Sequence, residues 1–325
     1  MKNKLYIIIV FVLIALICIV KLFELNLSKN GQGNIAEANS TRSYSDNVTM
    51  PMIKDFSIAK IPEKKSGVKA PNIYANNYIL FDINSKYPLI EKNAHVKVPV
   101  ASTTKIITAI IALENYKLDD IVEISKNAAS QIGSDVYLQT GEKITVNNLL
   151  YALLIQSGND AAMALAENMK DGGLDNFVRK MNEKAKTLGM NDSDFKDPAG
   201  LNDAGVSSAF DLAIATSYAL NSFSVFRDII KSTEYNFTSS DLNHRIHDLK
   251  TSNRLIESDE PLYMNSAIGV KTGFTPDAGH CLVSAASVNG TMLVGVILHT
   301  IEEKNDSSAR ESKKLLEWGF DNFNF

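Results

Sequence analysis

Residues 98–114 read Val98-Pro-Val-Ala-Ser-Thr-Thr-Lys-Ile-Ile-Thr-Ala-Ile-Ile-Ala-Leu-Glu114. Pro99 ends an extended segment, and Ser102 stands where a helix is expected to begin. The residues that follow are apolar nearly all the way round a helix, so they predict a buried helix from about Thr103. Ser102 and Lys105 are three positions apart and therefore share one face of its first turn.

This serine and lysine form a candidate nucleophile and base. A serine hydroxyl needs a base that removes its proton, and a lysine serves as that base only if burial lowers its pKa. The predicted buried helix supplies such surroundings for Lys105. The spacing alone is weak evidence, because Ser-x-x-Lys occurs at Ser57/Lys60, Ser66/Lys69, Ser102/Lys105 and Ser193/Lys196.

The composition is that of a globular protein and excludes some classes of function. The chain has 325 residues, of which 45% are hydrophobic and 22% charged, so it can bury the core of one large domain or two smaller ones. The net charge is −4 with no basic block, which gives nucleic-acid binding no support. No Cys/His cluster has zinc spacing, so neither a metal nor a cofactor is expected. Cys281, in a strand-like run, is expected to be a small buried apolar residue.

The N-terminus predicts attachment to a membrane. Lys2 and Lys4 precede an apolar run from Leu5 to Val20, so residues 1–25 are expected to form a membrane anchor or signal segment. No small-x-small cleavage site follows directly, which favours an uncleaved anchor. The two lysines indicate a cytoplasmic start with the rest of the chain outside the cell membrane, or secreted if the signal is cleaved.

Residues 26–70 are rich in Asn, Ser, Lys and Gly, and they predict a flexible tether. Two of the four Ser-x-x-Lys pairs fall in it, where no packed core could desolvate a lysine. We therefore discard Ser57/Lys60 and Ser66/Lys69 as catalytic candidates.

Beyond the tether, the chain alternates between strand-rich ends and a helical middle. Gly, Asn and Thr signals mark turns and caps between these elements, and Asn289-Gly290 predicts a two-residue hairpin turn. Ser157 and Asn159 fall in a predicted loop between two helices, with their side chains free. The expected strands are residues 77–83, 88–91, 122–124, 267–271, 279–288 and 291–299, and the expected helices are residues 146–155, 161–169, 174–188, 211–220 and 307–318.

Two further features receive simpler interpretations. Ser193/Lys196 lies in a loop downstream of Ser157, which is the wrong order for the arrangement developed below. His244 and His247 lie in a polar stretch, so a solvated pair is expected.

Three weak signals remain in one order, each on a different kind of element. They are Ser102-x-x-Lys105 at a helix start, Ser157-Gly-Asn159 in a loop and Lys271-Thr-Gly273 on a strand. At this point the sequence resembles the serine-type D-Ala-D-Ala carboxypeptidases, the low-molecular-mass penicillin-binding proteins of peptidase family S11 in the DD-peptidase and β-lactamase superfamily. The matching stretches are Pro-x-Ala-Ser-x-Thr-Lys (99–105), Gln-Ser-Gly-Asn-Asp-Ala-Ala (156–162), Asp-Pro-x-Gly-Leu (197–201), Ser-Ser-Ala-Phe-Asp-Leu-Ala (207–213) and Lys-Thr-Gly-Phe-Thr (271–275).

The resemblance implies roles for the residues around the nucleophile. Ser102 would attack the carbonyl of the D-Ala-D-Ala bond and form an acyl-enzyme, and unprotonated Lys105 would take its proton. Ser157 would relay a proton to the leaving D-alanine nitrogen, and Asn159 would orient Lys105 and the substrate amide. Which group is the true base is left open by the sequence.

The strand motif would bind the substrate. Lys271 would draw in the substrate carboxylate and help to lower the pKa of Lys105, while Thr272 would hydrogen-bond that carboxylate. Gly273 would keep the strand open to the substrate backbone. The backbone N–H groups of Ser102 and Phe274 would form the oxyanion hole.

The resemblance also implies an α+β fold, in which an antiparallel sheet flanked by helices meets a mostly helical lobe. The expected catalytic domain is residues 71–325, with the helical lobe at about 104–255 and no C-terminal β domain. The expected partners are a peptidoglycan stem peptide ending in D-Ala-D-Ala, β-lactam antibiotics as inhibitors, and the cytoplasmic membrane through the N-terminus.

Three alternatives stay open at this stage. A class A β-lactamase would need a glutamate after the Ser-x-Asn element, and the segment between Gly189 and Asp211 has none. A non-hydrolytic penicillin sensor or peptidoglycan-binding domain would have no reason to keep every motif residue. A transpeptidase or endopeptidase using the same site is chemically close.

Overall fold

The computed structural model describes residues 60–325 except 242 and 303. The expected anchor (1–25) and most of the expected tether lie outside these residues. Within the described part, none of the helices combines the length and the apolar character that a membrane span requires.

A five-stranded antiparallel sheet has the strand order β3-β2-β10-β9-β8, and its end strand β8 borders the candidate site. β8 pairs on one side only, with β9, so its other edge is open to the helical part of the molecule. Asn289 and Gly290 join β9 to β10 with positive φ angles of 50° and 83°, which confirms the predicted hairpin turn. The strands are β2 (Ala75–Asp82), β3 (Tyr87–Lys92), β8 (Ala267–Thr275), β9 (Gly279–Val288) and β10 (Thr291–Thr300).

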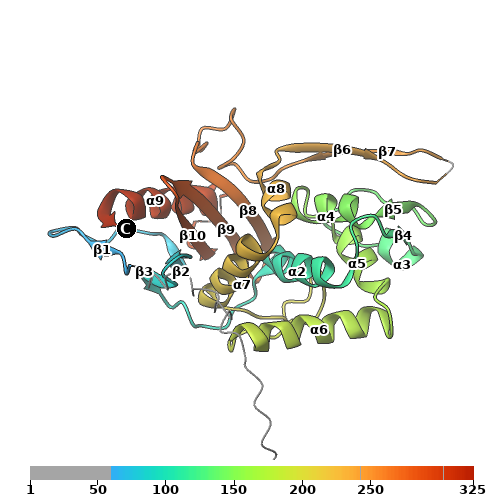
Figure 1. Cartoon of the computed structure of the whole chain (residues 1–325), viewed down its shortest axis with the longest axis horizontal. Coiled ribbons are helices and arrows are strands. Elements are labelled where there is room, and N and C mark those ends of the chain that lie inside the picture. The colour runs from blue at the N-terminus through green and yellow to red at the C-terminus, as the bar shows by residue number, and fades with distance from the viewer. Residues whose placement is uncertain (1–59, 242, 303) are drawn as a thin grey trace, which may run out of the picture. The chain divides into compact units, whose positions relative to one another are not determined.

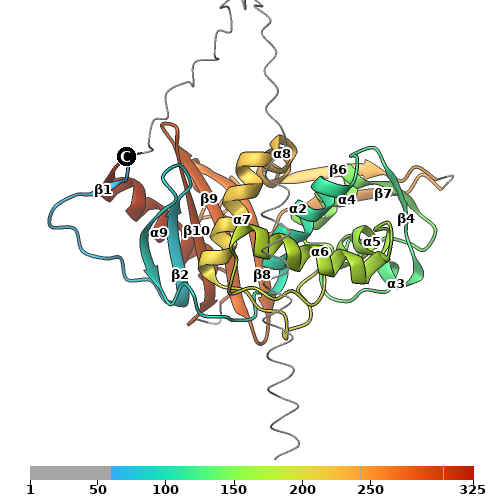
Figure 2. The ribbon, with the colours of Figure 1, turned by 60° about the horizontal axis from the view of Figure 1, so that its bottom comes forward.

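Helices cover both faces of this sheet (Figures 1 and 2). On β2, Leu80 packs with Leu315 and Leu316 of α9 (Ser307–Asn322), whereas its neighbours Ile79 and Phe81 face the larger core on the other side. Because successive strand residues point to opposite faces, this run is buried on both. α7 (Ala209–Ser222) and α8 (Ser224–Lys231) lie over the second face. The result is the predicted α+β fold.

The helical part is organised around α2 (Lys105–Asn115), which packs against α4, α6 and α7. A 3₁₀ turn, η1 (Ala101–Thr104), leads into it, and α2 is buried from Lys105 to Ala112. An apolar sequence on every face therefore produced a helix that is surrounded on every face, as predicted. The other helices are α3 (Lys126–Ala129), α4 (Val146–Leu154), α5 (Asn159–Glu167) and α6 (Gly173–Leu188).

The predicted helix ends are confirmed at two places. The Thr145 side chain accepts a hydrogen bond from the Asn148 backbone N–H at the start of α4 (3.2 Å). Gly189 ends α6 in the left-handed conformation, with φ of 78°. The short strands β4 (Ile121–Glu123) and β5 (Lys143–Thr145) pair beside these helices.

A long hairpin of β6 (Glu234–Thr238) and β7 (Ile246–Lys250) extends over the helical part, a feature that the sequence did not predict (Figure 1). Alternate residues of β7 point inward, so His247 is only 4% exposed while His244 lies exposed in the turn. The prediction of a solvated histidine pair is therefore wrong for His247. Its ring stacks on Phe237 with 4.8 Å between centroids.

The predicted tether extends too far toward the C-terminus. β1 (Glu63–Lys64) pairs with β11 (Phe323–Asn324), and the Trp318 indole N–H donates to the Lys69 carbonyl oxygen (3.0 Å). Residues 63–69 thus pack against the end of α9. A lysine-rich segment without periodicity gives no sign of this pairing, because the partner strand lies at the other end of the chain.

We expect Gly319→Ala to destabilise the protein through the packing of α9 on the sheet. An added Cβ would lie 2.4 Å from Leu80 Cδ2 and 2.9 Å from Leu293 Cδ1, and both leucines are fully buried. The free energy of unfolding in urea should fall by about 1–3 kcal/mol. Glu317→Ala, exposed on the same helix, should change it by less than about 0.5 kcal/mol. Equal stability of the two variants would contradict this account of the interface.

Candidate active site

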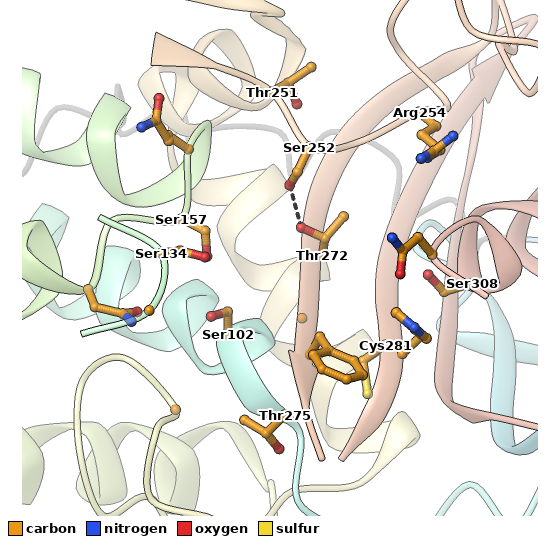
Figure 3. A pocket seen from close by; sticks show the side chains of 18 of the residues that line it. Ser102, Ser134, Ser157, Thr251, Ser252, Arg254, Thr272, Thr275, Cys281 and Ser308 are labelled. Carbon is orange, nitrogen blue, oxygen red and sulfur yellow. Dashed lines mark hydrogen bonds between the residues drawn. The ribbon is translucent and has the colours of Figure 1, made fainter. Parts of the chain in front are cut away.

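A cleft of about 690 Å³ lies where η1, the start of α5 and the open edge of β8 come together (Figure 3). It brings the three sequence signals into one place, although they are far apart in the chain. Figure 3 shows Ser102, Ser157 and Thr272 around the same space. The predicted residues that line it are Ser102, Ser157, Asn159, Thr272, Gly273 and Phe274. Lys105 and Lys271 are buried, with 0% and 1% of their surfaces exposed.

Lys105 reaches Ser102 from within the core. Its Nζ lies 2.8 Å from Ser102 Oγ, 2.7 Å from Asn159 Oδ1 and 2.9 Å from the Ala199 carbonyl oxygen. The last two atoms can only accept, so they take the two N–H bonds of a neutral amine. The amine lone pair is then left for the Ser102 hydroxyl proton.

Burial favours that neutral form of Lys105. Removal from water lowers the pKa of Lys105 well below its ordinary value, and the nearby charge of Lys271 lowers it further. Asp197 and Asp160 act in the opposite direction. The fully buried amine is thus suited to accept a proton from Ser102.

The loop that follows Phe195 presents the Ala199 carbonyl to Lys105. Asp197 Oδ1 accepts from the backbone N–H groups of Ala199 (2.7 Å) and Gly200 (2.6 Å), which fixes a tight turn. Gly200 has φ of +77°, and a Cβ there would lie 2.0 Å from the Ala101 carbonyl oxygen. Only glycine therefore allows this loop to approach η1 so closely.

Asn159 joins Lys105 to the opposite wall of the cleft. The sequence placed it in a loop, but the structure makes it the first residue of α5, directly after the left-handed turn at Ser157 (φ 66°). Its Oδ1 accepts from Lys105, and its Nδ2 donates to the Ile132 carbonyl oxygen (2.6 Å). The amide is thereby oriented from both ends.

Asp160, beside Asn159, organises the same wall. Its carboxylate accepts from the backbone N–H groups of Val136 and Leu138, each at 3.0 Å. Burial raises the pKa of Asp160, while these hydrogen bonds act to lower it. The carboxylate shapes the wall and lies close enough to affect the charge of Lys105.

Lys271 projects from β8 into the protein rather than into water. Burial lowers the pKa of Lys271 from 10.5 to about 7. Its Nζ donates to the Thr272 carbonyl oxygen (3.0 Å). A cationic Lys271 disfavours a second cation at Lys105, so the two lysines favour one charge between them.

The exposed side of β8 presents hydroxyl and backbone groups. Thr272 Oγ1 lies 2.6 Å from Ser252 Oγ, as the dashed line in Figure 3 shows. A Cβ on Gly273 would lie 3.1 Å from the Ser102 backbone nitrogen, so this strand lies directly beside η1. Phe274 is 58% exposed at the rim, 4.5 Å from the His280 ring.

Several residues that contribute to the site could not be identified from the sequence. Ser252 sits in a stretch without any motif, and the Ala199 carbonyl is a backbone atom that no side-chain pattern can reveal. Asp197 belongs to the matching stretch 197–201, but only the folded turn shows that its carboxylate accepts hydrogen bonds from consecutive backbone N–H groups. Cys281 also lines the cleft; it is 1% exposed, as predicted.

The site has the parts for acyl transfer through a serine nucleophile. It combines a serine hydroxyl, a buried lysine amine whose pKa is lowered, and a second lysine on an open strand edge. Residues 60–325, apart from 242 and 303, hold no group of three or more His, Cys, Asp or Glu side chains suited to a metal ion.

Comparisons with known proteins agree with this chemistry. Residues 64–301 match the peptidase S11 family model, described as D-alanyl-D-alanine carboxypeptidase. The chain is 33% identical over 259 residues to D-alanyl-D-alanine carboxypeptidase DacF of Bacillus subtilis, covering 77% of this chain and 63% of that protein. It is 33% identical over 272 residues to the D-alanyl-D-alanine carboxypeptidase of Streptomyces sp. K15, covering 78% of this chain and 90% of that one.

The structures agree as well. The crystal structure of the Streptomyces K15 DD-transpeptidase superposes with a TM-score of 0.72 at 32% identity, covering 78% of this chain and all of that one. The D-alanyl-D-alanine carboxypeptidase DacD of Francisella tularensis gives 0.70 at 28% identity, covering 79% and 73%. The chain spans only 63% of the length of DacF and of Escherichia coli DacC.

We expect the stability cost of burying Lys271 to depend on pH. Between pH 7 and 10.5 the unfolded chain holds a proton on Lys271 that the folded chain lacks, so the free energy of unfolding rises with pH in this window. The Lys271→Met variant lacks this rise in the free energy of unfolding, because methionine does not titrate. From about pH 7 to about pH 10, wild type should gain on the order of 4 kcal/mol relative to Lys271→Met in urea unfolding.

The exposed Lys186 provides the control. The stability difference between wild type and Lys186→Met should be the same at both pH values. The same constancy for Lys271→Met would contradict a pKa of Lys271 that burial lowers to about 7.

Proposed function

Because the chain belongs to the peptidase S11 family, we propose that it removes the terminal D-alanine from peptidoglycan stem peptides through a serine acyl-enzyme. The observation that carries this proposal is the 2.8 Å contact between Ser102 Oγ and the fully buried Lys105 Nζ. The open edge of β8 beside it offers the place for an extended peptide.

Acylation begins at Ser102. Its oxygen forms a bond to the carbonyl carbon of the penultimate D-alanine, and its proton passes to Lys105. The C–N bond to the terminal D-alanine then breaks, and the leaving nitrogen takes a proton through Ser157. Water then hydrolyses the ester and restores the Ser102 hydroxyl. Asn159 supports both steps by holding Lys105 and the substrate amide.

Two groups of the substrate would be bound: its terminal carboxylate, and the negative charge that develops on the carbonyl oxygen during acylation. Thr272 and its neighbour Ser252 are suited to bind the terminal carboxylate with two hydroxyls. Lys271, whose Nζ donates to the Thr272 carbonyl oxygen, would add its positive charge from behind the strand. The backbone N–H groups of Ser102 and Phe274 would stabilise the oxyanion. The close approach of Gly273 to η1 supports this pairing.

β-Lactam antibiotics are expected to acylate the same serine and inhibit the enzyme. A β-lactamase would need a base to activate the deacylating water, and no glutamate lies between Gly189 and Asp211. A penicillin adduct on Ser102 should therefore persist. Transfer to an amine in place of water would use the same acyl-enzyme, which keeps transpeptidation as a second candidate activity.

We also propose where the enzyme works. Residues 1–25 would anchor the chain in the cytoplasmic membrane, and residues 26–59 would link that anchor to a catalytic domain outside it. The apolar run from Leu5 to Val20, with Lys2 and Lys4 before it, supports this arrangement.

A single comparison separates the candidate functions. Wild type and Ser102→Ala are incubated with a fluorescent penicillin and with diacetyl-Lys-D-Ala-D-Ala. We expect wild type to release D-alanine and to keep a long-lived penicillin adduct. Ser102→Ala should lose both, with peptide hydrolysis reduced at least about 1,000-fold, because the nucleophile is absent.

Ser193→Ala is the matched control. It carries the same Ser-x-x-Lys spacing, but Lys196 there pairs with Asp194 at 2.8 Å. This variant should retain both reactions. Rapid turnover of penicillin would instead indicate a β-lactamase, and an adduct without D-alanine release would indicate a sensor.

A further inference from the structure

A buried histidine outside the cleft has no part in the mechanism above. His247 lies on β7, its Nδ1 3.0 Å from the Val136 carbonyl oxygen and its Nε2 3.1 Å from Glu142 Oε1. The side chains of His247 and Glu142 are 2% and 3% exposed. A buried ionisable pair is costly unless its geometry is well satisfied, so its presence calls for a physical reason.

The partners of His247 hold its ring from both sides. A carbonyl oxygen can only accept, so the Nδ1–H of His247 donates to Val136. Nε2 faces Glu142 Oε1, so the ring is held from its other side as well. Glu142 Oε2 also accepts from the Gln139 backbone N–H (2.6 Å), and Arg245 Nε lies 3.9 Å from Oε1. Glu142 therefore holds the ring in the orientation in which Nδ1 faces Val136.

Val136 belongs to the wall loop, which we define as residues 132–138. Gly133 and Ser134 of this loop line the cleft. The Val136 backbone is held from two sides, because its N–H donates to Asp160 Oδ2 (3.0 Å) while its carbonyl accepts from His247. β7 makes a second link through Gln156, whose amide joins the Asp135 carbonyl (2.9 Å) to the Lys250 N–H (3.3 Å).

The wall loop in turn holds the residue that contacts the base. The Asn159 side chain donates to the Ile132 carbonyl oxygen (2.6 Å), and its backbone N–H donates to the Ser134 carbonyl oxygen (2.7 Å). The same side chain accepts from Lys105 at 2.7 Å. A displaced loop would therefore move Asn159 relative to Lys105.

We propose that His247 and Glu142 are positioning residues, which hold the wall loop so that Asn159 keeps Lys105 in line with Ser102. This inference rests on the proposed function, because it assigns the pair to the acylation step. The hairpin of β6 and β7 then stabilises the position of the wall loop in the active site.

The test measures acylation of Ser102 by a fluorescent penicillin in the full chain. His247→Phe keeps the ring stack on Phe237 but loses the donor to Val136, and it should slow acylation about tenfold, since small misplacements of reacting groups have large effects. His247→Asn, whose amide N–H can replace Nδ1–H, should recover most of that rate. Glu142→Gln keeps the histidine and removes the charge, so it should slow acylation to a lesser extent.

Two controls separate positioning from general stability. Phe237→Leu removes the ring that stacks on His247 and should lower the melting temperature while acylation stays near the wild-type rate. His244→Ala, on the exposed turn of the same hairpin, should change neither. Amide hydrogen exchange at Val136 and Leu138 should speed up in His247→Phe and return toward normal in His247→Asn.

Several results would overturn the proposal. One is wild-type acylation in Glu142→Gln, which also serves if His247→Phe does not fold. Others are failure of His247→Asn to recover the rate, or equal slowing in Phe237→Leu. Absence of D-alanine release by wild type would refute the proposed carboxypeptidase activity alone, because the penicillin readout still measures how well Ser102 and Lys105 are positioned.

Discussion

The contact between Lys105 and Ser102 is the interaction on which the rest of the site depends. An amine at the buried start of a helix must either form hydrogen bonds or ion pairs or lose its charge, because removal from water penalises the ammonium form. The protein supplies two obligate acceptors, Asn159 Oδ1 and the Ala199 carbonyl oxygen, and leaves the third direction to Ser102. Burial and partner geometry together suit this lysine to the role of a base.

Each of the two acceptors, Asn159 Oδ1 and the Ala199 carbonyl oxygen, is held in place by further hydrogen bonds from other parts of the fold. Asp197 gathers consecutive backbone N–H groups so that Ala199 faces the lysine, and Gly200 lets that loop lie against Ala101. Asn159 is held by the wall loop, which Asp160 binds from one side and His247 from the other. The hydrogen bond between His247 and Val136 alone joins residues 111 positions apart in sequence, so the support of this site comes from distant parts of the chain.

The sequence predicted the elements better than the contacts between them. Apolar periodicity located α2, α4 and α6, and the Asn289-Gly290 pair located the hairpin turn, because these signals are local. The β6–β7 hairpin and the burial of His247 were missed, since a short strand with polar residues on both faces has no clear period. Asn159 was placed in a loop, although it is the first residue of α5. Residues 63–69 were placed in the tether, because the strand that pairs with β1, at 323–324, is distant in sequence.

By itself, the sequence predicted the three motifs that must meet, and through its family resemblance it predicted the α+β fold. The position of each pair along the chain and the apolar run after Lys105 favoured Ser102-x-x-Lys105 among the four matching pairs. Only the tertiary structure decided which atoms surround the amine: a backbone carbonyl from Ala199, an amide held by a loop, and a second lysine on a strand edge. A pKa depends on burial and on charges at a few ångströms, and such distances exist only after the chain has folded.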